Sequence, residues 1–353
     1  GLTILPHEID EWDTNGTSRV WVRVPELSGP EDFIWAYWGN PLDIQPPPSA
    51  TNGAVWLPET ALVWHLKESG FPFADSTAMH PALSGVAPLS TSGEIGRAVS
   101  FNGTSQFLNA GAVNLGDAFT LSSWVKLDAG ATDIQPIWAN KGGGWNANGF
   151  ALFVNSYQTT DRMLRLETGD GVNGSAAVTA TGAVSLGQWH LITATVDRSA
   201  GSARLYIDGT DRTQNGPAAT DFANTGMLAL GEVTNGSYHI DGVIDEARVE
   251  NGTRSADWIR ASWMTVSSNT DFQEYSAAIP QLPVLSAQPR GNGELSVSWP
   301  ASAVGFTLFT TTNLTPPVVW QPGTNQPIFT NNQWQATLPV SESGERFYRL
   351  QFQ

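Results

Sequence analysis

A glycine-rich loop near the middle of the chain carries residue types that recognise sugars. Between Asn140 and Gly149 the sequence reads NKGGGWNANG. Sugar binding needs a flat apolar surface for the C–H faces of the ring and planar polar groups for its hydroxyls. We expect the glycines to expose Trp145, although the indole folding back onto its own loop is an open alternative. The predicted ligand-binding residues are Asn140, Trp145, Asn146, Asn148, Tyr157 and Asp170.

Motifs of other chemistries are missing from the sequence. It has no phosphate-binding loop, no dinucleotide-binding glycine motif and no zinc motif. None of its scattered histidines has an obvious serine or aspartate partner by motif. His239 precedes Asp241 closely, but we interpret it as a histidine that is satisfied at the surface.

Composition narrows the class of protein. The net charge of −16 disfavours nucleic acid and anionic membrane surfaces as partners, and it is compatible with cation binding. The absence of cysteine excludes disulfides, and no apolar run reaches membrane-spanning length. Abundant Gly, Pro and Trp (35, 22 and 15 residues), with only 14% charged residues, are typical of an all-β chain. A length of 353 residues favours two or three domains.

The loop must be positioned by strands, and residues 187–209 give the clearest strand pattern. From Trp189 to Val196 the side chains alternate with the period of a strand, and Arg204–Asp208 resumes the alternation after a break at 199–201. Asp208-Gly209 is a turn signal, because Gly adopts positive φ without steric cost. This stretch therefore predicts an antiparallel hairpin with one buried face.

This hairpin, WH…LYIDG, resembles the core of laminin-G-like, concanavalin-A-type jelly rolls. Residues 96–103, 119–126 and 242–249 resemble the opening, following and closing strands of that family, in the same order. The resemblance implies an all-β, concanavalin-A-like jelly-roll sandwich over residues 55–278. It implies less about the ligand, because the fold hosts lectins, hydrolases and adhesion modules.

The resemblance also implies a calcium site. Family members place one aspartate in a loop after the first strand and another at the start of the last strand. Asp75 and His80 in the segment DSTAMH, and Asp245 in IDE, match these positions, with Met79 departing from the usual Asn or Gly. Calcium prefers several carboxylate and carbonyl oxygens, so we expect a structural Ca²⁺. In the alternative reading, Asp75 caps a turn and Asp245 pairs with Arg97 or Arg248.

Glucanases of this superfamily carry Glu-x-Asp-x-(x)-Glu on one strand, which directs the carboxylates into one cleft. The nearest stretch here, DGVIDEARVE at 241–250, has no Glu-x-Asp pair. On a regular strand Asp245 and Glu246 would also point to opposite faces. The sequence therefore predicts a protein without catalytic residues.

The N-terminal flank, residues 1–45, predicts strands at 20–25 and 34–38. It resembles the second half of an uncharacterised module of bacterial surface proteins (DUF2341-like). Half a sandwich leaves sheet edges open. Either these strands pack on the jelly roll, or strands from another copy or from the missing half complete them by β-augmentation. Residues 46–54 read as a proline-rich linker.

The C-terminal flank predicts a closing helix near 255–264 with Ser255 as N-cap, and a second linker at 279–283. Residues 284–353 predict strands at 295–299, 306–311, 333–338 and 347–351, which fit a small fibronectin-III-like or Ig-like sandwich.

These patterns predict a non-catalytic recognition or adhesion protein that binds a polysaccharide or glycoprotein glycan with the help of calcium. We expect an exported, mature or trimmed fragment of a bacterial surface protein, extracellular or at the cell surface. The main alternative is a structural subunit of a cell-surface assembly built by strand complementation. The third possible function is that of a glycoside hydrolase.

Overall fold

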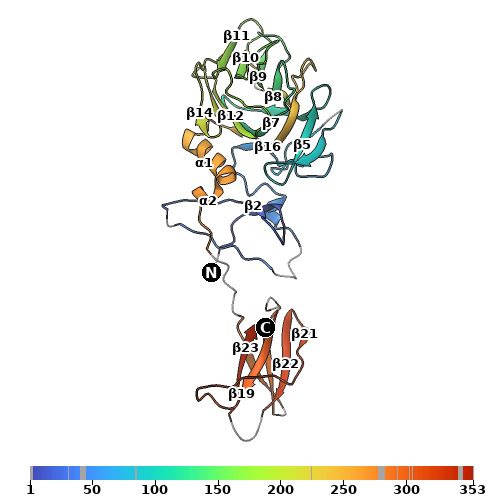
Figure 1. Ribbon diagram of the computed structural model, residues 1–353, viewed down its shortest axis with the longest axis vertical. Helices are drawn as coiled ribbons and strands as arrows, with labels where there is room; N and C mark the ends of the chain where they lie inside the picture. The colour runs from blue at the N-terminus through green and yellow to red at the C-terminus, as the bar shows by residue number, and fades with distance from the viewer. Residues whose placement is uncertain are drawn as a thin grey trace. The chain divides into compact units, whose positions relative to one another are not determined.

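The computed structural model describes residues 3–30, 32–39, 45–83, 86–223, 225–276, 283–291, 293–301, 303, 305–340 and 345–352. The chain divides into two compact units. The first contains Gly1–Glu26 and Pro46–Tyr275, and the second contains Leu27–Gln45 and Ser276–Gln353. The architecture is mostly antiparallel β-sheet (Figure 1), which confirms the predicted all-β jelly-roll sandwich.

One sheet of the jelly roll follows the order β14-β13-β12-β7-β16-β5-β4, with β3 also paired to β16. Along the side of β16 away from β7, residues 241–244 pair with β5 and residues 247–250 pair with β3. Glu246, between these two halves, has a left-handed φ of 50°. The strands of this sheet are β3 (Thr60–Trp64), β4 (Leu89–Ser92), β5 (Arg97–Asn102), β7 (Ala118–Leu127), β12 (His190–Asp197), β13 (Ser202–Ile207), β14 (Thr210–Asp211) and β16 (Asp241–Asn251).

The other sheet follows the order β11-β10-β9-β8-β15-β6. Its strands are β6 (Leu108–Asn114), β8 (Gln135–Ala139), β9 (Gly149–Val154), β10 (Leu164–Gly169), β11 (Gly174–Val178) and β15 (Thr225–Leu230). Side chains from both sheets share one core, in which Trp64 stacks on Trp138 with ring centroids 6.1 Å apart and Phe119 meets Phe150 at 5.0 Å. The predicted hairpin is confirmed as β12 and β13. In the neighbouring strand Trp124 is buried, whereas Trp189, just before β12, is only half-buried under Lys126.

The closing helix is confirmed as α1 (Ala256–Ser267), followed by the short α2 (Asn269–Phe272). The hydroxyl of Ser255 accepts a hydrogen bond from the backbone N–H of Trp258, which satisfies one free donor of the first turn. The helix packs beside β14 at the edge of its sheet (Figure 1), and Ile259 is its buried residue. None of the helices in the described part of the chain has the length and hydrophobicity needed to span a bilayer.

Residues 3–26 form a hairpin of β1 (His7–Glu11) and β2 (Arg19–Val22), which belongs to the same compact unit as the jelly roll. The 3₁₀ turn η1 (Pro48–Ala50) holds it through Ser49, whose hydroxyl donates to the carbonyl of His7 at 2.6 Å. Of the two anticipated arrangements, this chain shows the hairpin packed on its own jelly roll. The predicted strand at 34–38 is wrong, because these residues have no ladder partner and no strand structure.

The C-terminal unit contains a small sandwich of two sheets, ordered β17-β18-β22-β21 and β20-β19-β23. All four predicted strands are confirmed, and Val297, Trp299, Leu308 and Leu338 are in the core. The predicted linker at 279–283 lies outside the described residues except for Pro283. The strands are β17 (Ser286–Arg290), β18 (Glu294–Pro300), β19 (Phe306–Thr311), β20 (Gln321–Pro322), β21 (Ile328–Thr330), β22 (Gln333–Pro339) and β23 (Phe347–Phe352).

Candidate functional site

Two neighbouring loops, residues 140–148 between β8 and β9 and residues 170–173 between β10 and β11, form one edge of the jelly roll that we call the Trp145 rim. Trp145 is 47% exposed. Its indole packs on the backbone of Gly174, where an added Cβ would approach the ring to 2.5 Å. The guanidinium of Arg165 lies 5.3 Å from the ring centroid. The indole is therefore held in place and still partly open to solvent.

The predicted asparagines mainly hold the rim together. The Asn140 side chain accepts a hydrogen bond from the N–H of Phe150 at 2.7 Å and donates to the carbonyl of Ala223 at 2.9 Å. Asn148 accepts from the N–H of Ala223 at 2.5 Å. These side-chain amides position the loop, so their carbonyl and NH₂ groups are not both free to bind a ligand.

Asn146 and Asp170 link the two loops of the rim. The Asn146 amide donates to the carbonyl of Val172 at 3.2 Å. Asp170 accepts hydrogen bonds from the N–H groups of Asn173 and Val172 at 2.6 and 2.7 Å, and these bonds lower the pKa of its carboxyl. The structure therefore brings Asn140, Trp145, Asn146, Asn148 and Asp170 together at one edge of the sheet.

Beneath Trp145 lies a charged group that the sequence did not reveal. The ammonium of Lys141 is buried, donates to the carbonyl of Trp145 at 3.1 Å and lies 3.3 Å from a carboxylate oxygen of Glu167. Burial lowers the pKa of Lys141. Arg165 pairs with the other oxygen of Glu167 at 2.9 Å, so this carboxylate fixes both cations below the indole.

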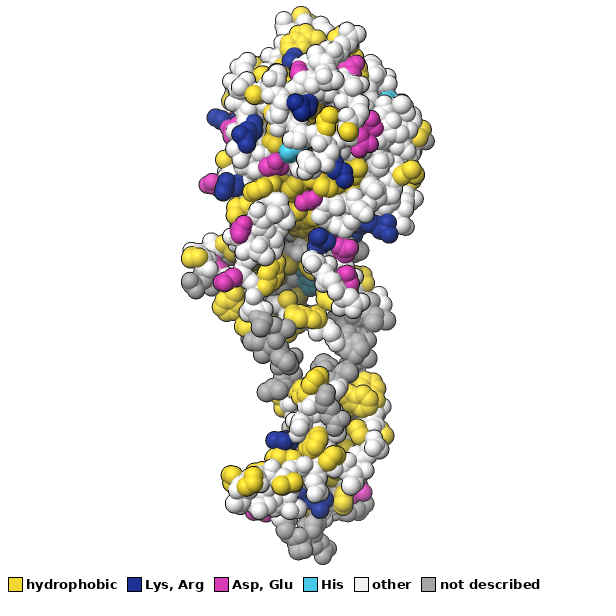
Figure 2. Space-filling model, in the orientation of Figure 1, with side chains coloured by type: hydrophobic (Ala, Val, Ile, Leu, Met, Phe, Trp, Pro, Cys, Tyr) yellow, Lys and Arg dark blue, Asp and Glu magenta, His cyan; other side chains and the backbone are white. Residues whose placement is uncertain are grey.

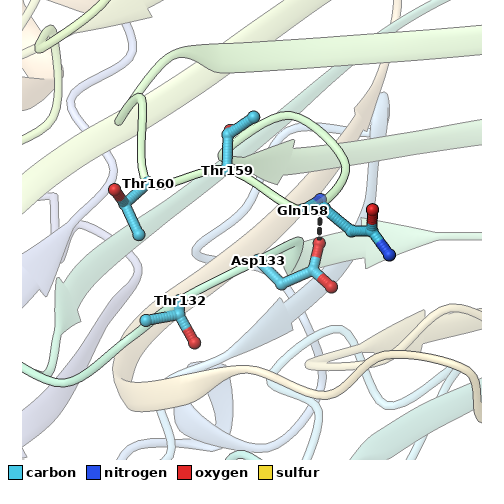
Figure 3. A pocket seen from close by; sticks show the side chains of 5 residues that line it. All are labelled: Thr132, Asp133, Gln158, Thr159 and Thr160. Atoms are coloured by element: carbon cyan, nitrogen blue, oxygen red, sulfur yellow. Dashed lines mark hydrogen bonds between the residues drawn. The ribbon is translucent and has the colours of Figure 1, made fainter.

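Tyr157 does not join the rim. It lies in the loop after β9, whereas Trp145 lies in the loop before it, so the strand separates them. The ring is 61% exposed and its hydroxyl accepts a hydrogen bond from the amide of Gln158 at 2.9 Å. Near this loop an open depression of about 390 Å³ is lined by Thr132, Asp133, Gln158, Thr159 and Thr160 (Figure 3). Asp133 accepts from the N–H of Gln158 there at 2.7 Å.

The residues predicted to bind calcium occupy separate hydrogen-bonded positions. The buried carboxylate of Asp75 accepts from the N–H groups of Val63, Thr77, Met79 and His80 and from the Thr77 hydroxyl, so it caps its loop. Nδ1 of His80 lies 3.2 Å from the carbonyl of Ala110. Asp245 accepts from the N–H of Ile95 at 2.9 Å. Among the described residues, these three side chains do not form a cluster of metal-ligating atoms.

A second cluster, which we call the His65 cluster, lies under strand β1. His65 is hydrogen-bonded through Nδ1 to Glu246 at 2.7 Å and through Nε2 to Glu8. Burial alone would lower the pKa of His65, but the two carboxylates raise it to about 9. Asp10 also faces the cluster, and burial together with the charge of Glu246 raises its pKa to about 6. The side chains of all four residues are 1–2% exposed.

Two tryptophans and an arginine close this cluster. The rings of Trp21 and Trp56 lie 6.1 and 5.6 Å from that of His65. The guanidinium of Arg248 lies 4.1 and 4.7 Å from the same two indoles, and it donates to Glu246. Burial raises the pKa of neighbouring Asp245 well above its usual range. The sequence does not reveal this cluster beyond the alternation of Glu8 and Asp10 around Ile9 in β1.

Residues 102–260 match the family described as the concanavalin A-like lectin/glucanases superfamily. No curated protein matches the chain in sequence.

Several solved structures are similar. Domain 4 of AbnA, an extracellular arabinanase from Geobacillus stearothermophilus solved with arabinotriose, is 18% identical over 57% of this chain and 97% of that one, with a TM-score of 0.44. Trypanosoma rangeli sialidase is 14% identical over 60% of this chain and 33% of its own, with a TM-score of 0.45. The binding domain of Paraclostridial Mosquitocidal Protein 1 is 12% identical over 77% and 65%, with a TM-score of 0.46.

Proposed function

We propose that the protein binds a polysaccharide or glycoprotein glycan without cleaving it, because residues 102–260 match the concanavalin A-like lectin/glucanases superfamily. The Trp145 rim is the proposed binding surface. The observation that carries this proposal is the indole of Trp145, which contacts Gly174 and Arg165 while 47% of its residue surface stays exposed. A fixed, exposed aromatic face is what the apolar side of a sugar ring packs against.

The acidic groups of the rim favour binding over cleavage. Glycoside hydrolysis requires two carboxyl groups about 5–10 Å apart on either side of the scissile bond. Among the described residues of the rim loops and the β10 face beneath them, the carboxylates are Glu167 and Asp170. Glu167 is paired with two cations and Asp170 with two backbone N–H groups. Both carboxylates already support the loops, which leaves neither as a free acid or nucleophile.

One face of the jelly roll is mixed in charge. On the face shown in Figure 2, charged side chains of the jelly roll are scattered among uncharged ones rather than collected by sign. This favours an uncharged or weakly charged sugar over a strongly anionic polymer, which the net charge of −16 would repel.

A glycan array followed by titration of the best ligand tests the proposal. We expect Trp145→Ala to lose about 2 kcal/mol of binding free energy, roughly a thirtyfold weaker Kd, as for a central aromatic contact. Trp258→Ala is the matched control, because Trp258 on α1 is 46% exposed and also lies near an arginine, with the Arg254 guanidinium 4.8 Å from its ring.

Three outcomes would contradict this proposal. One is a wild-type protein that binds no glycan on the array. Another is equal binding by wild type and Trp145→Ala, or equal losses in both tryptophan variants. Release of new reducing ends from a bound polysaccharide would contradict the non-catalytic part alone.

Calcium binding is a further prediction of this proposal, and self-assembly is the alternative to it. If a structural Ca²⁺ is bound near Asp75 and Asp245, elemental analysis will detect calcium and its removal will lower the Tm of the jelly roll.

The alternative function, assembly by strand complementation, is supported by the two-stranded sheet of β1 and β2, which has open edges. Size-exclusion chromatography distinguishes the two functions. Ordered polymers without glycan affinity would favour assembly, and a monomer with glycan affinity would favour glycan recognition.

A further inference from the structure

The His65 cluster lies at an interruption in the larger sheet of the jelly roll. Strand β16 exchanges its neighbour from β5 to β3 around Asp245 and Glu246, where the left-handed φ of Glu246 breaks the regular alternation. His65 follows the last residue of β3 directly. Strand β1 covers this point and turns Glu8 and Asp10 inward. Three segments distant in sequence therefore place their polar side chains in one enclosed space.

Three atoms in this space have the arrangement of metal ligands. Nδ1 of His65 lies 2.7 Å from Oε1 of Glu246 and 3.7 Å from Oδ1 of Asp10, and a ligand atom from each residue lies within 4.8 Å of the other two. Oδ1 of Asp10 is buried and has no hydrogen-bond partner, and the nearest ammonium, on Lys67, is 3.8 Å away. A buried carboxylate oxygen without a partner is costly, so a cation bound beside Asp10 would be strongly favoured.

The surrounding contacts are those that orient metal ligands. A metal-binding histidine usually donates its second ring N–H to a carboxylate, and Nε2 of His65 is hydrogen-bonded to Glu8. The second oxygen of Glu246 is likewise held by Arg248 at 2.5 Å. A proton on Nδ1 can serve Glu246 but leaves Asp10 unsatisfied at 3.7 Å. A metal cation in place of this proton would contact the side chains of Asp10, His65 and Glu246.

We propose that Asp10, His65 and Glu246 bind a divalent transition-metal ion, with Zn²⁺ as the best fit, and that the ion fastens the N-terminal hairpin to the jelly roll. An imidazole nitrogen with carboxylate oxygens suits zinc, whereas calcium takes oxygen ligands only. The burial of all three side chains makes this a closed, structural site. It shares no ligand with the predicted calcium set, although Glu246 is next to Asp245 in β16, and it is independent of glycan binding at the Trp145 rim.

The test is calorimetric titration of the metal-stripped full chain with ZnCl₂, and separately with CaCl₂. We expect one equivalent of Zn²⁺ to bind and Ca²⁺ not to compete at Asp10. Asp10→Asn preserves the shape of the side chain and removes the ligand charge, so we expect at least tenfold weaker Zn²⁺ binding. Glu11→Gln is the matched control, because Glu11 is next in the same strand and its carboxylate faces outward to Arg19. The affinity of this variant for zinc should equal that of wild type.

Thermal melting gives a second readout. Zn²⁺ should raise the Tm of wild type and of Glu11→Gln, and should raise that of Asp10→Asn by less at the same concentration. In wild type, Co²⁺ should give visible absorption bands that Zn²⁺ abolishes, which requires no variant to fold. The proposal is overturned if wild type binds no zinc, if Asp10→Asn binds it as tightly as wild type, or if Ca²⁺ occupies the cluster instead. In those cases the cluster is held by protons and ion pairs alone.

Discussion

The Trp145 rim and the His65 cluster use the same kinds of residue for opposite purposes. Each combines tryptophan with arginine and places carboxylates beside cations. At the rim one face of the indole is fixed by Arg165 and the residue stays half exposed. In the cluster Arg248 and His65 both pack against Trp21 and Trp56, and both tryptophans are less exposed than Trp145. Residue type alone therefore does not separate recognition from packing, and burial decides which one occurs.

The two regions also differ in what an altered charge should cost. Exposed ion pairs contribute about 0–1 kcal/mol, because water screens them and competes for the groups. Removing one partner of a buried pair costs about 3–5 kcal/mol, because the remaining charge is left without compensation. The substitutions below test this contrast from its strongest case to its weakest.

Glu246→Gln should have the largest effect. Burial would raise the pKa of Glu246, but His65 and Arg248 lower it on balance, so the group is a carboxylate that compensates the buried imidazole of His65 and the half-buried guanidinium of Arg248. We expect the metal-free protein to lose about 3–5 kcal/mol of unfolding free energy in urea. A loss below about 1 kcal/mol, the range of surface pairs, would show that the cluster does not behave as a buried network.

Gly174→Ala should have the largest effect at the rim. An added Cβ would lie 2.5 Å from the indole of Trp145 and 2.7 Å from its carbonyl oxygen. The loop must shift, which we expect to cost about 1–3 kcal/mol in urea unfolding and to weaken glycan binding. Gly130→Ala is the control, because nothing lies within 4 Å of a Cβ there and its φ is not left-handed. Equal stability of the two variants would contradict the packing of Trp145 on Gly174.

Glu232 supplies a pH-dependent test near the rim. It precedes the loop whose Thr234 N–H donates to the carbonyl of Lys141, and burial raises the pKa of Glu232 to about 7. Its folded pKa lies above the unfolded value, so the folded state holds the proton more tightly between about pH 4.5 and 7. Stability from this group is therefore present below pH 4.5 and lost as the pH rises to 7.

Neighbouring His239, whose Nε2 lies 3.2 Å from Glu232, has a pKa lowered by burial and so opposes this slope below about pH 6.5. The Tm of wild type minus that of Glu232→Gln isolates the carboxyl. We expect this difference to fall steadily from pH 4.5 to 7 and to level off above pH 8. A flat difference would indicate that Glu232 titrates as an ordinary surface acid.

The sequence predicted the strands and the exposed tryptophan because their signals are local. Alternation gave β12, β13 and the C-terminal strands, and three glycines before Trp145 indicated an exposed loop. Tyr157 was placed with that loop by nearness in sequence, but one strand separates them. Residues 34–38 alternate as a strand does, yet alternation cannot supply the ladder partner that a strand needs.

The His65 cluster was not predictable by the same reasoning. In β1 the sequence HEIDE alternates, and the usual pattern would turn Ile9 inward and its acidic neighbours outward. The structure does the reverse, because Glu8 meets a histidine 57 residues away and that histidine meets Glu246 a further 181 residues along. No local pattern carries such pairings. Regular alternation also fails at Glu246, where the left-handed backbone leaves both Glu246 and Asp245 buried.

Glu11→Gln should have the smallest effect and completes the comparison. Glu11 follows Asp10 in β1, but its carboxylate is 40% exposed and pairs with Arg19 of β2 at 2.5 Å, with the arginine side chain 38% exposed. We expect its loss to cost less than about 1 kcal/mol in urea, and to become smaller still in 1 M salt, where the Debye length falls to about 3 Å. The Glu246→Gln cost should change little with salt, because water and ions do not reach the cluster. If both variants responded to salt alike, burial would not be the property that distinguishes the His65 cluster from the outer face of the hairpin.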